Sequence, residues 1–264
     1  MTLYTTVLVH TDDQGVSTVT LNRPEVKNAL NALMIRELTQ VMMELSASSA
    51  TRLVVINSSG TVFCAGADLN HMQQIATFGY DENLSDALQL GDLFAAINQC
   101  HKPVITVVQG GAYGGGVGLI AASDICIASS DSKFCLSEVR LGIVPGVISP
   151  YLVNAIGQRQ AQRFALTAEI IPSDLALDIG LIHYSTNNTI ETLNTVVAQL
   201  LKGSTSAQSA TKSLFRAVGG YSITPELKSS AAQAIATARS TADGQEGLKA
   251  FLEKRHPYWI KKHD

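Results

Sequence analysis

The sequence has little of what would mark a secreted, metal-binding or membrane-embedded protein. It holds only four cysteines among 264 residues, and none of them falls in a CxxC or Cys/His spacing. We therefore expect free, mostly buried thiols in a reducing, cytoplasmic location, with no metal site. The longest apolar stretches are interrupted by Gly, Ser or Asp, and the first residues lack a charged-then-apolar leader, so no membrane contact is expected.

Charge of either sign is also scarce. The chain has 19 basic and 22 acidic residues, a net charge of −3, and only 16% of its residues are charged. No run of Lys or Arg appears before the C-terminal tail, so the sequence does not predict a nucleic-acid-binding surface. An anionic substrate would have to be met by a few local charges.

What the chain does have is apolar residues (46%) and 20 glycines, the composition of a globular protein with a sizeable core. Strand-like and helical segments alternate up to about residue 130, which predicts an α/β fold with more than one sheet layer. The predicted strands are Thr6–His10, Val16–Leu21, Leu53–Ile56, Pro103–Val108 and Asp124–Ala128. The predicted helices of this part are Asn31–Leu45, Asp68–Ile75, Leu84–Cys100 and Val117–Ala122.

Beyond Pro150 the pattern predicts helices alone, and no low-complexity linker separates them from the first part. These helices are expected at Leu152–Ile156, Gln160–Thr167, Ser173–Ile179, Ile190–Leu201, Ala207–Val218, Pro225–Ala238 and Gly244–Lys254.

Two glycine-containing turns each follow a predicted strand and precede a helix. They are FCAGADL at 63–69 and GGGVGL at 114–119. A helix start presents unpaired N–H groups and a favourable dipole, and small residues allow a ligand to approach the backbone closely. Two such groups aimed at one point would form an oxyanion hole. Either turn alone is more often a tight connection. Nucleotide-binding glycine fingerprints are not matched, because Leu119 stands where the last glycine should be.

Glu138 lies in an otherwise apolar stretch, FCLSEVRLGIVPG at 134–146. A carboxylate in this setting is either a surface residue or a desolvated acid/base whose pKa is raised. From the stretch alone, the surface interpretation is the more common one.

The three segments FCAGADL, QGGAYGGGVGL and FCLSEVRLGIVPG, in this order, resemble the enoyl-CoA hydratase/isomerase (crotonase) superfamily. The opening LNRP…NALN at 21–31 is similar to that family's N-terminal signature as well. The resemblance implies a spiral of ββα repeats followed by helices that build trimers, commonly stacked as hexamers. It places the spiral core at 1–200 and a helical region for trimer contacts and part of the acyl-CoA pocket at 201–264.

Carried over to this chain, the resemblance implies that Ala67 and Gly115 supply the oxyanion-hole N–H groups and that Glu138 is the catalytic acid/base. The substrate would be an acyl-CoA thioester, with no cofactor other than its own coenzyme A. The implied substrate-binding residues are Lys27, Asn28, Ala29, Ala65, Asp68, Leu69, Asn70, Gly114, Gly118 and Arg140.

The chain departs from the family's two-glutamate pattern at Gly118, where the first glutamate would stand. The phrase LSEVRLGIVPGVISPYLVNAIGQRQAQRF at 136–164, joined to GGGVGL at 114–119, looks like the branch that contains bacterial 3-methylglutaconyl-CoA hydratases and hydratases of related branched acyl-CoAs. In that branch, the missing side chain would leave room for a C3 substituent or a second carboxylate. Arg140 would be the candidate counter-charge, although a surface or subunit-interface role is the more common one for such a residue.

The activity that this resemblance implies is reversible hydration of the C2=C3 bond of an enoyl-CoA by one glutamate. Two alternatives stay open. An enoyl-CoA isomerase needs a single base to carry a proton between carbons, and one glutamate is what the chain retains. A non-catalytic acyl-CoA-binding or RNA-binding protein of the same fold is the alternative of another class, and the net charge of −3 weighs against RNA.

Overall fold

The computed structural model describes residues 4–260, which form two compact units. The first comprises the chain up to Cys100 together with Val104–Leu193, and the second comprises His101–Pro103 and the chain from Asn194 onwards. The boundary between these two units falls near residue 194, inside a helix. Each unit is described by itself below.

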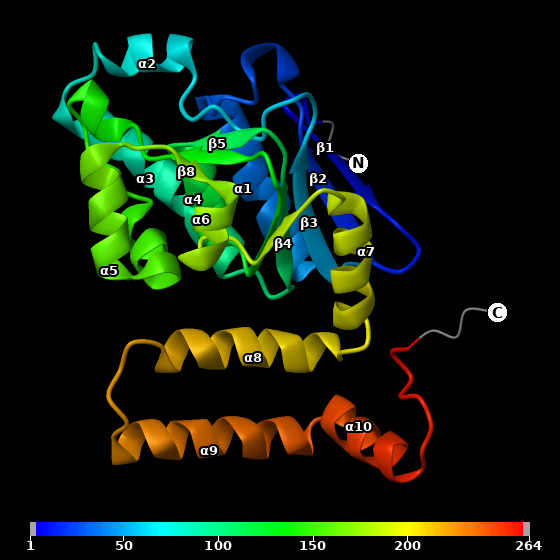
Figure 1. Cartoon of the computed structure of the whole chain (residues 1–264). Helices are drawn as coiled ribbons and strands as arrows, with labels where there is room; N and C mark the ends of the chain where they lie inside the picture. The colour runs from blue at the N-terminus through cyan, green and yellow to red at the C-terminus, as the bar shows by residue number, and fades with distance from the viewer. Residues whose placement is uncertain (1–3, 261–264) are drawn as a thin grey trace. The chain divides into compact units, whose positions relative to one another are not determined.

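The first unit is built on a six-stranded sheet with the order β1-β2-β3-β4-β6-β9 (Figure 1). A tight turn at Asp12–Gly15 joins β1 and β2 as an antiparallel hairpin, and the other neighbours pair in parallel. Apolar runs such as Leu53–Ile56 are buried because both faces of the central strands are covered. The strands are β1 Val7–Thr11, β2 Val16–Leu21, β3 Leu53–Ser58, β4 Val104–Val108, β6 Ile125–Ser129 and β9 Tyr184–Thr186.

A second, smaller sheet has the order β5-β7-β8, with β5 at Gly111–Tyr113, β7 at Lys133–Cys135 and β8 at Ile171–Pro172. Isolated parallel bridges extend this layer, since Cys64 pairs with Ala112 and Ala67 pairs with Leu30. Each strand of the large sheet from β2 to β6 is thus followed by a short segment of the small layer and then by a helix. This repetition is the ββα spiral that the family resemblance implies.

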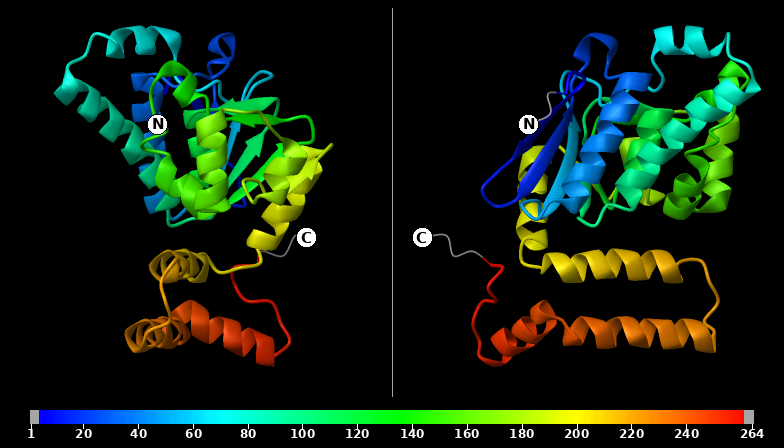
Figure 2. Two further views of the ribbon diagram at one scale, coloured as in Figure 1. Left: turned by 60° about the vertical axis from the view of Figure 1, so that its left-hand side comes forward. Right: turned by 180° about the vertical axis from the view of Figure 1, so that it is seen from behind.

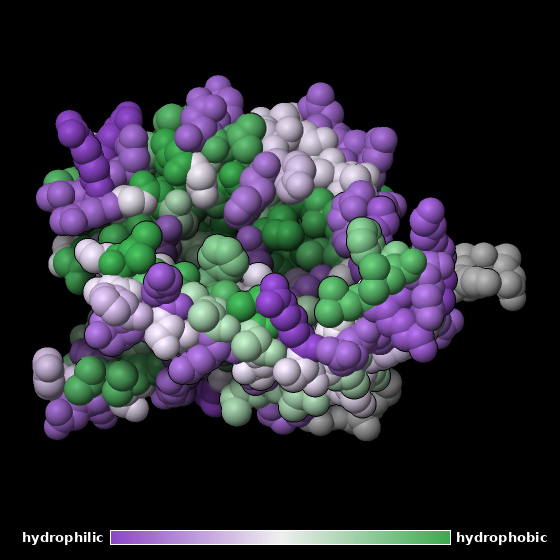
Figure 3. All heavy atoms as spheres, turned by 90° about the horizontal axis from the view of Figure 1, so that it is seen from below, coloured by the Kyte–Doolittle hydropathy of each residue, from purple (hydrophilic) through white to green (hydrophobic). Residues whose placement is uncertain are grey.

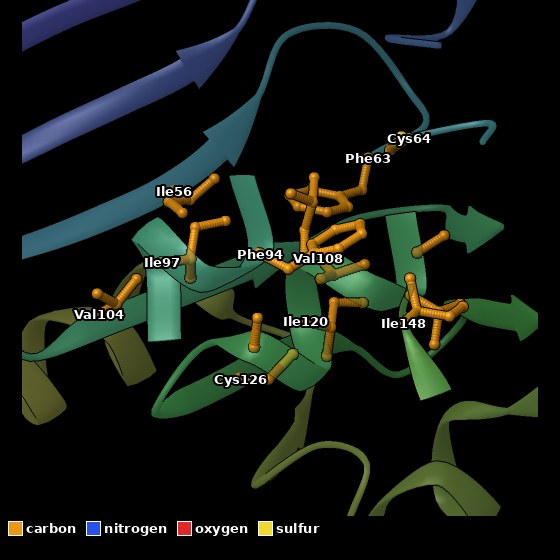
Figure 4. Close-up of a cluster of buried hydrophobic side chains, with 14 of the residues drawn as sticks. Ile56, Phe63, Cys64, Phe94, Ile97, Val104, Val108, Ile120, Cys126 and Ile148 are labelled. Atoms are coloured by element: carbon orange, nitrogen blue, oxygen red, sulfur yellow. The ribbon is translucent and has the colours of Figure 1, made fainter. Parts of the chain in front are cut away.

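Helices of the first unit lie on one side of the large sheet, where α1, α3, α4 and α5 are packed in sequence (Figures 1 and 2). Their apolar side chains and those of the sheet form one core, in which Phe94 lies near the centre (Figure 4). The helices are η1 Pro24–Val26, α1 Ala32–Ala47, α2 Leu69–Ile75, α3 Tyr80–Asn98, α4 Gly115–Ala122, η2 Glu138–Leu141, α5 Ser149–Thr167 and α6 Ser173–Asp178.

The second unit consists of helices with few buried side chains. Helix α7, Thr189–Leu200, crosses the boundary and is followed by α8 Thr205–Val218, α9 Pro225–Ser240 and α10 Ala242–Leu252. Asp243 fastens α10 to the start of α8 by accepting hydrogen bonds from Ser204 and Ser206. Many of the larger apolar side chains of the second unit remain at the surface. Hydrophobic and hydrophilic residues are interspersed on the face shown in Figure 3.

The predicted elements mostly match these bounds. The expected pair of helices at Leu152–Ile156 and Gln160–Thr167 is confirmed, because α5 consists of two helical pieces separated at Gly157, whose φ of 73° is not helical. The strands β5, β7, β8 and β9 have only two or three residues, too few to show a period. Within residues 4–260, no helix is both long enough and apolar enough to cross a membrane.

Candidate active site

The small sheet brings the three predicted catalytic segments to one edge. Ala67 ends the segment that pairs with β5, Gly115 comes two residues after β5, and Glu138 comes three residues after β7. These segments run parallel, so their carboxyl ends meet at the same edge of the layer. In open α/β sheets this edge is where ligands bind.

The first turn is held so that the Ala67 amide faces away from its strand neighbour. The Leu30 N–H donates to Gly66 O at 2.7 Å, and the Asp68 N–H donates to Leu30 O at 2.9 Å. Backbone groups alternate in direction along an extended segment, so the N–H of Ala67 points to the opposite side. Ala67 is exposed, and its N–H meets no acceptor within the part of the chain that the structure describes.

The second turn lies directly beside the first. Gly66 has φ +93°, and a methyl group at its Cα would lie 3.1 Å from the carbonyl oxygen of Tyr113. Gly114, at φ +49°, donates its N–H to Cys135 O at 2.9 Å, which fixes the turn to the end of β7. Gly115 is the first residue of α4 and is half-buried; its N–H has no acceptor in residues 4–260. Both free amides thus begin or precede a helix, where the dipole favours negative charge.

Glu138 completes the arrangement at Gly114. A methyl group built on Gly114 would lie 3.2 Å from Oε1 of Glu138, a tight contact that would move the carboxyl group by a few tenths of an ångström. The other oxygen, Oε2, is buried and has no hydrogen-bond partner among the described residues. Burial raises the pKa of Glu138 above its ordinary value, although its own backbone N–H opposes the shift. A half-buried carboxyl group with an unpaired oxygen is suited to exchange protons with a ligand.

The space in front of Gly118 is filled, which corrects one expectation. A methyl group at this position would lie 2.4 Å from Cγ2 of Ile148 and 2.7 Å from Cζ of Phe94. Both side chains are buried, and Phe94 also contacts the ring of Tyr151 with centroids 6.0 Å apart. The missing glutamate therefore leaves no vacant space for a carboxylate at Gly118. Apolar atoms take its place.

Comparison with known proteins shows the family. The family model described as enoyl-CoA hydratase/isomerase matches residues 11–262. The chain belongs to the enoyl-CoA hydratase/isomerase family. The crystal structure of an enoyl-CoA hydratase from Shewanella pealeana superposes with a TM-score of 0.95 at 37% identity, covering 97% of this chain and 96% of the other.

Two sequence relatives cover nearly their whole lengths. A Thermus thermophilus protein named as an enoyl-CoA hydratase is 31% identical over 95% of this chain and 99% of its own. The 2,3-dehydroadipyl-CoA hydratase of Escherichia coli is 30% identical over 95% and 97%, respectively. The crotonase-like α/β fold with a C-terminal helical region, expected from the sequence, is thereby confirmed.

Asn28, which the resemblance predicts to bind substrate, makes its side-chain hydrogen bonds within the protein. Its side chain is fully buried, accepts from the Arg23 N–H at 2.8 Å, and donates to Ser59 O and Val62 O. Lys27 and Asn28 both adopt positive φ, so they form a sharp turn that leads into the bridge at Leu30. Ala65 joins this turn through its N–H, which donates to Lys27 O at 3.0 Å, and Ala29 is buried beside it.

The other predicted substrate-binding residues differ in their exposure and in whether their side chains are hydrogen-bonded within the protein. Leu69 and Asn70 are exposed at the start of α2, next to Ala67. The Asp68 carboxylate is already paired within the protein, because it accepts from the Asn70 and His71 N–H groups and from Arg23. Arg140 is exposed on η2, and one of its N–H groups donates to Ala168 O at 2.7 Å.

Sequence reasoning missed Phe94 and Ile148 as residues of this site. Both read as ordinary core positions in apolar patterns, and nothing in their spacing shows that they meet in front of Gly118. They come from α3 and from the residue preceding α5, which are brought together only by packing against α4.

The packed space predicts how substitutions at Gly118 behave. Gly118→Ala should lower the free energy of unfolding by about 1–3 kcal/mol, because the added methyl group overpacks a filled core. Gly91→Ala is the matched control, since its nearest neighbour would be Val147 at an ordinary 3.8 Å. Both positions are helical, so the difference between the variants in urea denaturation reports packing alone. An equally stable Gly118→Ala protein would contradict the filled space.

Proposed function

We propose that this enzyme catalyses the reversible addition of water across the C2=C3 bond of an enoyl-CoA thioester. The observation that carries this proposal is that two turns with free amides adjoin one half-buried carboxyl group at Gly114. Family membership supplies the acyl-CoA substrate class. The chemistry calls on two amides and one carboxylate, with no cofactor beyond the coenzyme A of the substrate.

In the proposed reaction, the thioester oxygen accepts hydrogen bonds from the N–H groups of Ala67 and Gly115. Negative charge grows on this oxygen when a nucleophile adds at C3, so the two bonds strengthen in the transition state more than in the ground state. The loss of one such donor typically costs about 3–4 kcal/mol of activation free energy. The adjacent helix starts add a favourable dipole.

Glu138 then serves as the only acid/base. As a carboxylate it takes a proton from water while the water oxygen bonds to C3, and the protonated Glu138 then gives this proton to C2 of the resulting enolate, which restores the carboxylate. Addition from one side places both new bonds on the face that Glu138 occupies. Its raised pKa suits both roles, because a group that gains and releases a proton in one cycle works best near the ambient pH.

The isomerase alternative is favoured by one specific observation, the apolar filling at Gly118. A second polar group to hold water is absent from this position, where Phe94 and Ile148 lie instead. A single carboxylate in a dry setting is sufficient to move a proton between C4 and C2. Hydration remains the primary proposal because the relatives at 30% identity or more named above are called hydratases.

Glu138→Gln should lower kcat for hydration by about 100-fold or more, because glutamine keeps the shape but cannot exchange the proton. Turnover is measured in ¹⁸O-labelled water, in which hydration incorporates the label into the product and isomerisation does not. Glu44→Gln, an exposed glutamate of α1, is the control and should retain full activity.

Label incorporation at the wild-type rate by Glu138→Gln would remove this residue from the mechanism. Conversion of a 3-enoyl-CoA without label, together with no hydration of any 2-enoyl-CoA, would establish the isomerase instead.

For the acyl chain, we propose a branched dicarboxylic enoyl-CoA resembling 3-methylglutaconyl-CoA. The branch-like segments 136–164 and 114–119 support this choice, and the name of the Escherichia coli relative denotes a dicarboxylic acyl chain. Arg140 lies two residues after Glu138 and is exposed, so it is the proposed partner of the distal carboxylate.

This substrate assignment predicts that 3-methylglutaconyl-CoA has a higher kcat/KM than crotonyl-CoA. Arg140→Gln should raise KM about 10-fold or more for the dicarboxylic substrate, the scale of one lost charge-assisted contact, and leave crotonyl-CoA unaffected. Steady-state kinetics on both substrates test it. A variant with equal losses on both, or a wild-type preference for crotonyl-CoA, would refute the dicarboxylic assignment.

We also propose a cytoplasmic homotrimer, or a hexamer made of two trimers, that does not bind nucleic acid. The second unit supports assembly because several of its large apolar side chains are exposed, including Phe215 (68%), Ile223 (90%) and Phe251 (81%). Surfaces of this kind mark protein–protein contacts. The four cysteines are free and buried, in keeping with a reducing compartment.

Light scattering on purified protein should therefore give a mass of three or six chains at micromolar concentration. Assembly by apolar burial weakens little with added salt, so the same mass is expected in 0.1 M and 1 M salt. A monomer under both conditions would contradict the proposed assembly.

A further inference from the structure

Arg23 connects the two backbone segments that hold the Ala67 amide. It lies between β2 and η1, and its guanidinium makes contacts with both sides of the Leu30–Ala67 bridge. Nη1 donates to Ala29 O at 2.6 Å, one residue before Leu30. Nη2 donates to Asp68 Oδ2 at 2.8 Å, one residue after Ala67. One planar group thus spans the pair of segments at the position of the amide.

The ion pair is largely removed from water. The Arg23 side chain is 16% exposed and that of Asp68 is 5% exposed. Burial would raise the pKa of Asp68, but hydrogen bonds from Arg23 and from the His71 and Asn70 N–H groups outweigh it and lower the pKa. Asp68 is therefore held as an anion, and the attraction between the two groups is stronger than that of a surface pair.

Asp68 also fixes the direction in which the chain leaves Ala67. Its Oδ1 caps α2 by accepting from Asn70 N–H at 2.9 Å and His71 N–H at 3.2 Å, while its own N–H is bound to Leu30 O. The peptide plane that carries the Ala67 N–H begins at Gly66, which has no side chain to restrict its rotation and adopts φ +93°. On the Gly66 side this plane is held by the Leu30 N–H, which donates to Gly66 O at 2.7 Å, and on the other side the chain is held by the contacts of Asp68.

We propose that the Arg23–Asp68 pair is a positioning device that aims the Ala67 N–H at the substrate carbonyl. This inference rests on the proposed oxyanion role of Ala67. It assigns to Arg23 a role in the reaction although it does not contact the reacting atoms, and it assigns to Asp68 a positioning role in place of direct substrate binding. Oxyanion stabilisation depends on donor orientation, so a small rotation of this plane is expected to affect kcat more than KM.

Two variants break the pair in different ways. Arg23→Lys keeps the positive charge but cannot bridge Ala29 and Asp68 with one planar group. Asp68→Asn removes the anion and keeps a side-chain oxygen that caps α2, since asparagine is as good a cap as aspartate. Arg163→Gln is the matched control, because it breaks an Arg–Glu pair of equal length, 2.8 Å, that is exposed at 50% and 41%.

The test uses full-length protein and [1-¹³C]butanoyl-CoA, a saturated thioester that cannot be hydrated. Hydrogen bonds to the carbonyl oxygen draw electron density from the carbon, so its NMR signal should move downfield on binding to the wild type. We expect Arg23→Lys and Asp68→Asn to lose most of this shift and to lower kcat about 10- to 100-fold, with little change in KM. Arg163→Gln should retain both the shift and kcat.

The double variant should be no worse than either single one, because the two residues act as one unit. Circular dichroism melting curves identify folded variants, and Asp68→Asn provides the test if Arg23→Lys does not fold. Retention of the carbonyl shift and kcat in both folded single variants would overturn the positioning role. A wild-type protein without any shift would overturn the proposed oxyanion site, and with it this inference. A carbonyl shift that the wild type shows and both single variants lose, in a protein that hydrates no enoyl-CoA, would support the positioning role of the Arg23–Asp68 pair and refute hydration.

Discussion

The parallel alignment of the short strands in the small layer is the constraint on which the rest of the molecule depends. Parallel segments end at a common edge, and here three of them end in Ala67, Gly115 and Glu138. Because each segment turns into a helix or a short 3₁₀ turn, the edge presents helix-start amides where a developing negative charge is best stabilised. The larger sheet and its helices provide the buried core that keeps this edge rigid.

Glycine makes the close approach of these segments possible. Gly66 and Gly114 both have positive φ, and each lies against the neighbouring turn with no space for a side chain. Their positions bring the amide of one turn, the amide of the next and the Glu138 carboxyl group into one small region. The cost is rotational freedom at the residue before Ala67. Main-chain pairing with Leu30 and the Arg23–Asp68 ion pair counteract this freedom.

The sequence alone predicts the long regular elements well and the site only in part. The helical spacing of apolar residues predicts α1, and a short continuous apolar run predicts the buried strand β3. By contrast, β5 and β7 have three residues each, so pairing rather than propensity creates them. The roles proposed for Ala67, Gly115 and Glu138 rest on the family resemblance, and the structure supplies the physical reason that such distant residues adjoin.

Two contacts between residues that are distant in the sequence could not be predicted from local sequence patterns. Phe94 and Ile148, which are far apart in the sequence, both pack against Gly118. The position that the resemblance predicted to be open is therefore closely packed. Arg23 and Asp68 are 45 residues apart and form an ion pair that no periodicity reveals. Both depend on the spiral, which returns successive repeats to the same place. Tertiary packing therefore determines what surrounds Gly118 and what anchors the chain beside Ala67.

A crystal structure of the protein with bound butanoyl-CoA would test the central claim most directly. The account predicts that the thioester oxygen lies within hydrogen-bond distance, about 2.7–3.2 Å, of both the Ala67 and Gly115 nitrogens. The Glu138 carboxyl group should then lie over C2 and C3. A thioester oxygen that contacts neither amide, or an acyl chain bound away from Glu138, would contradict it.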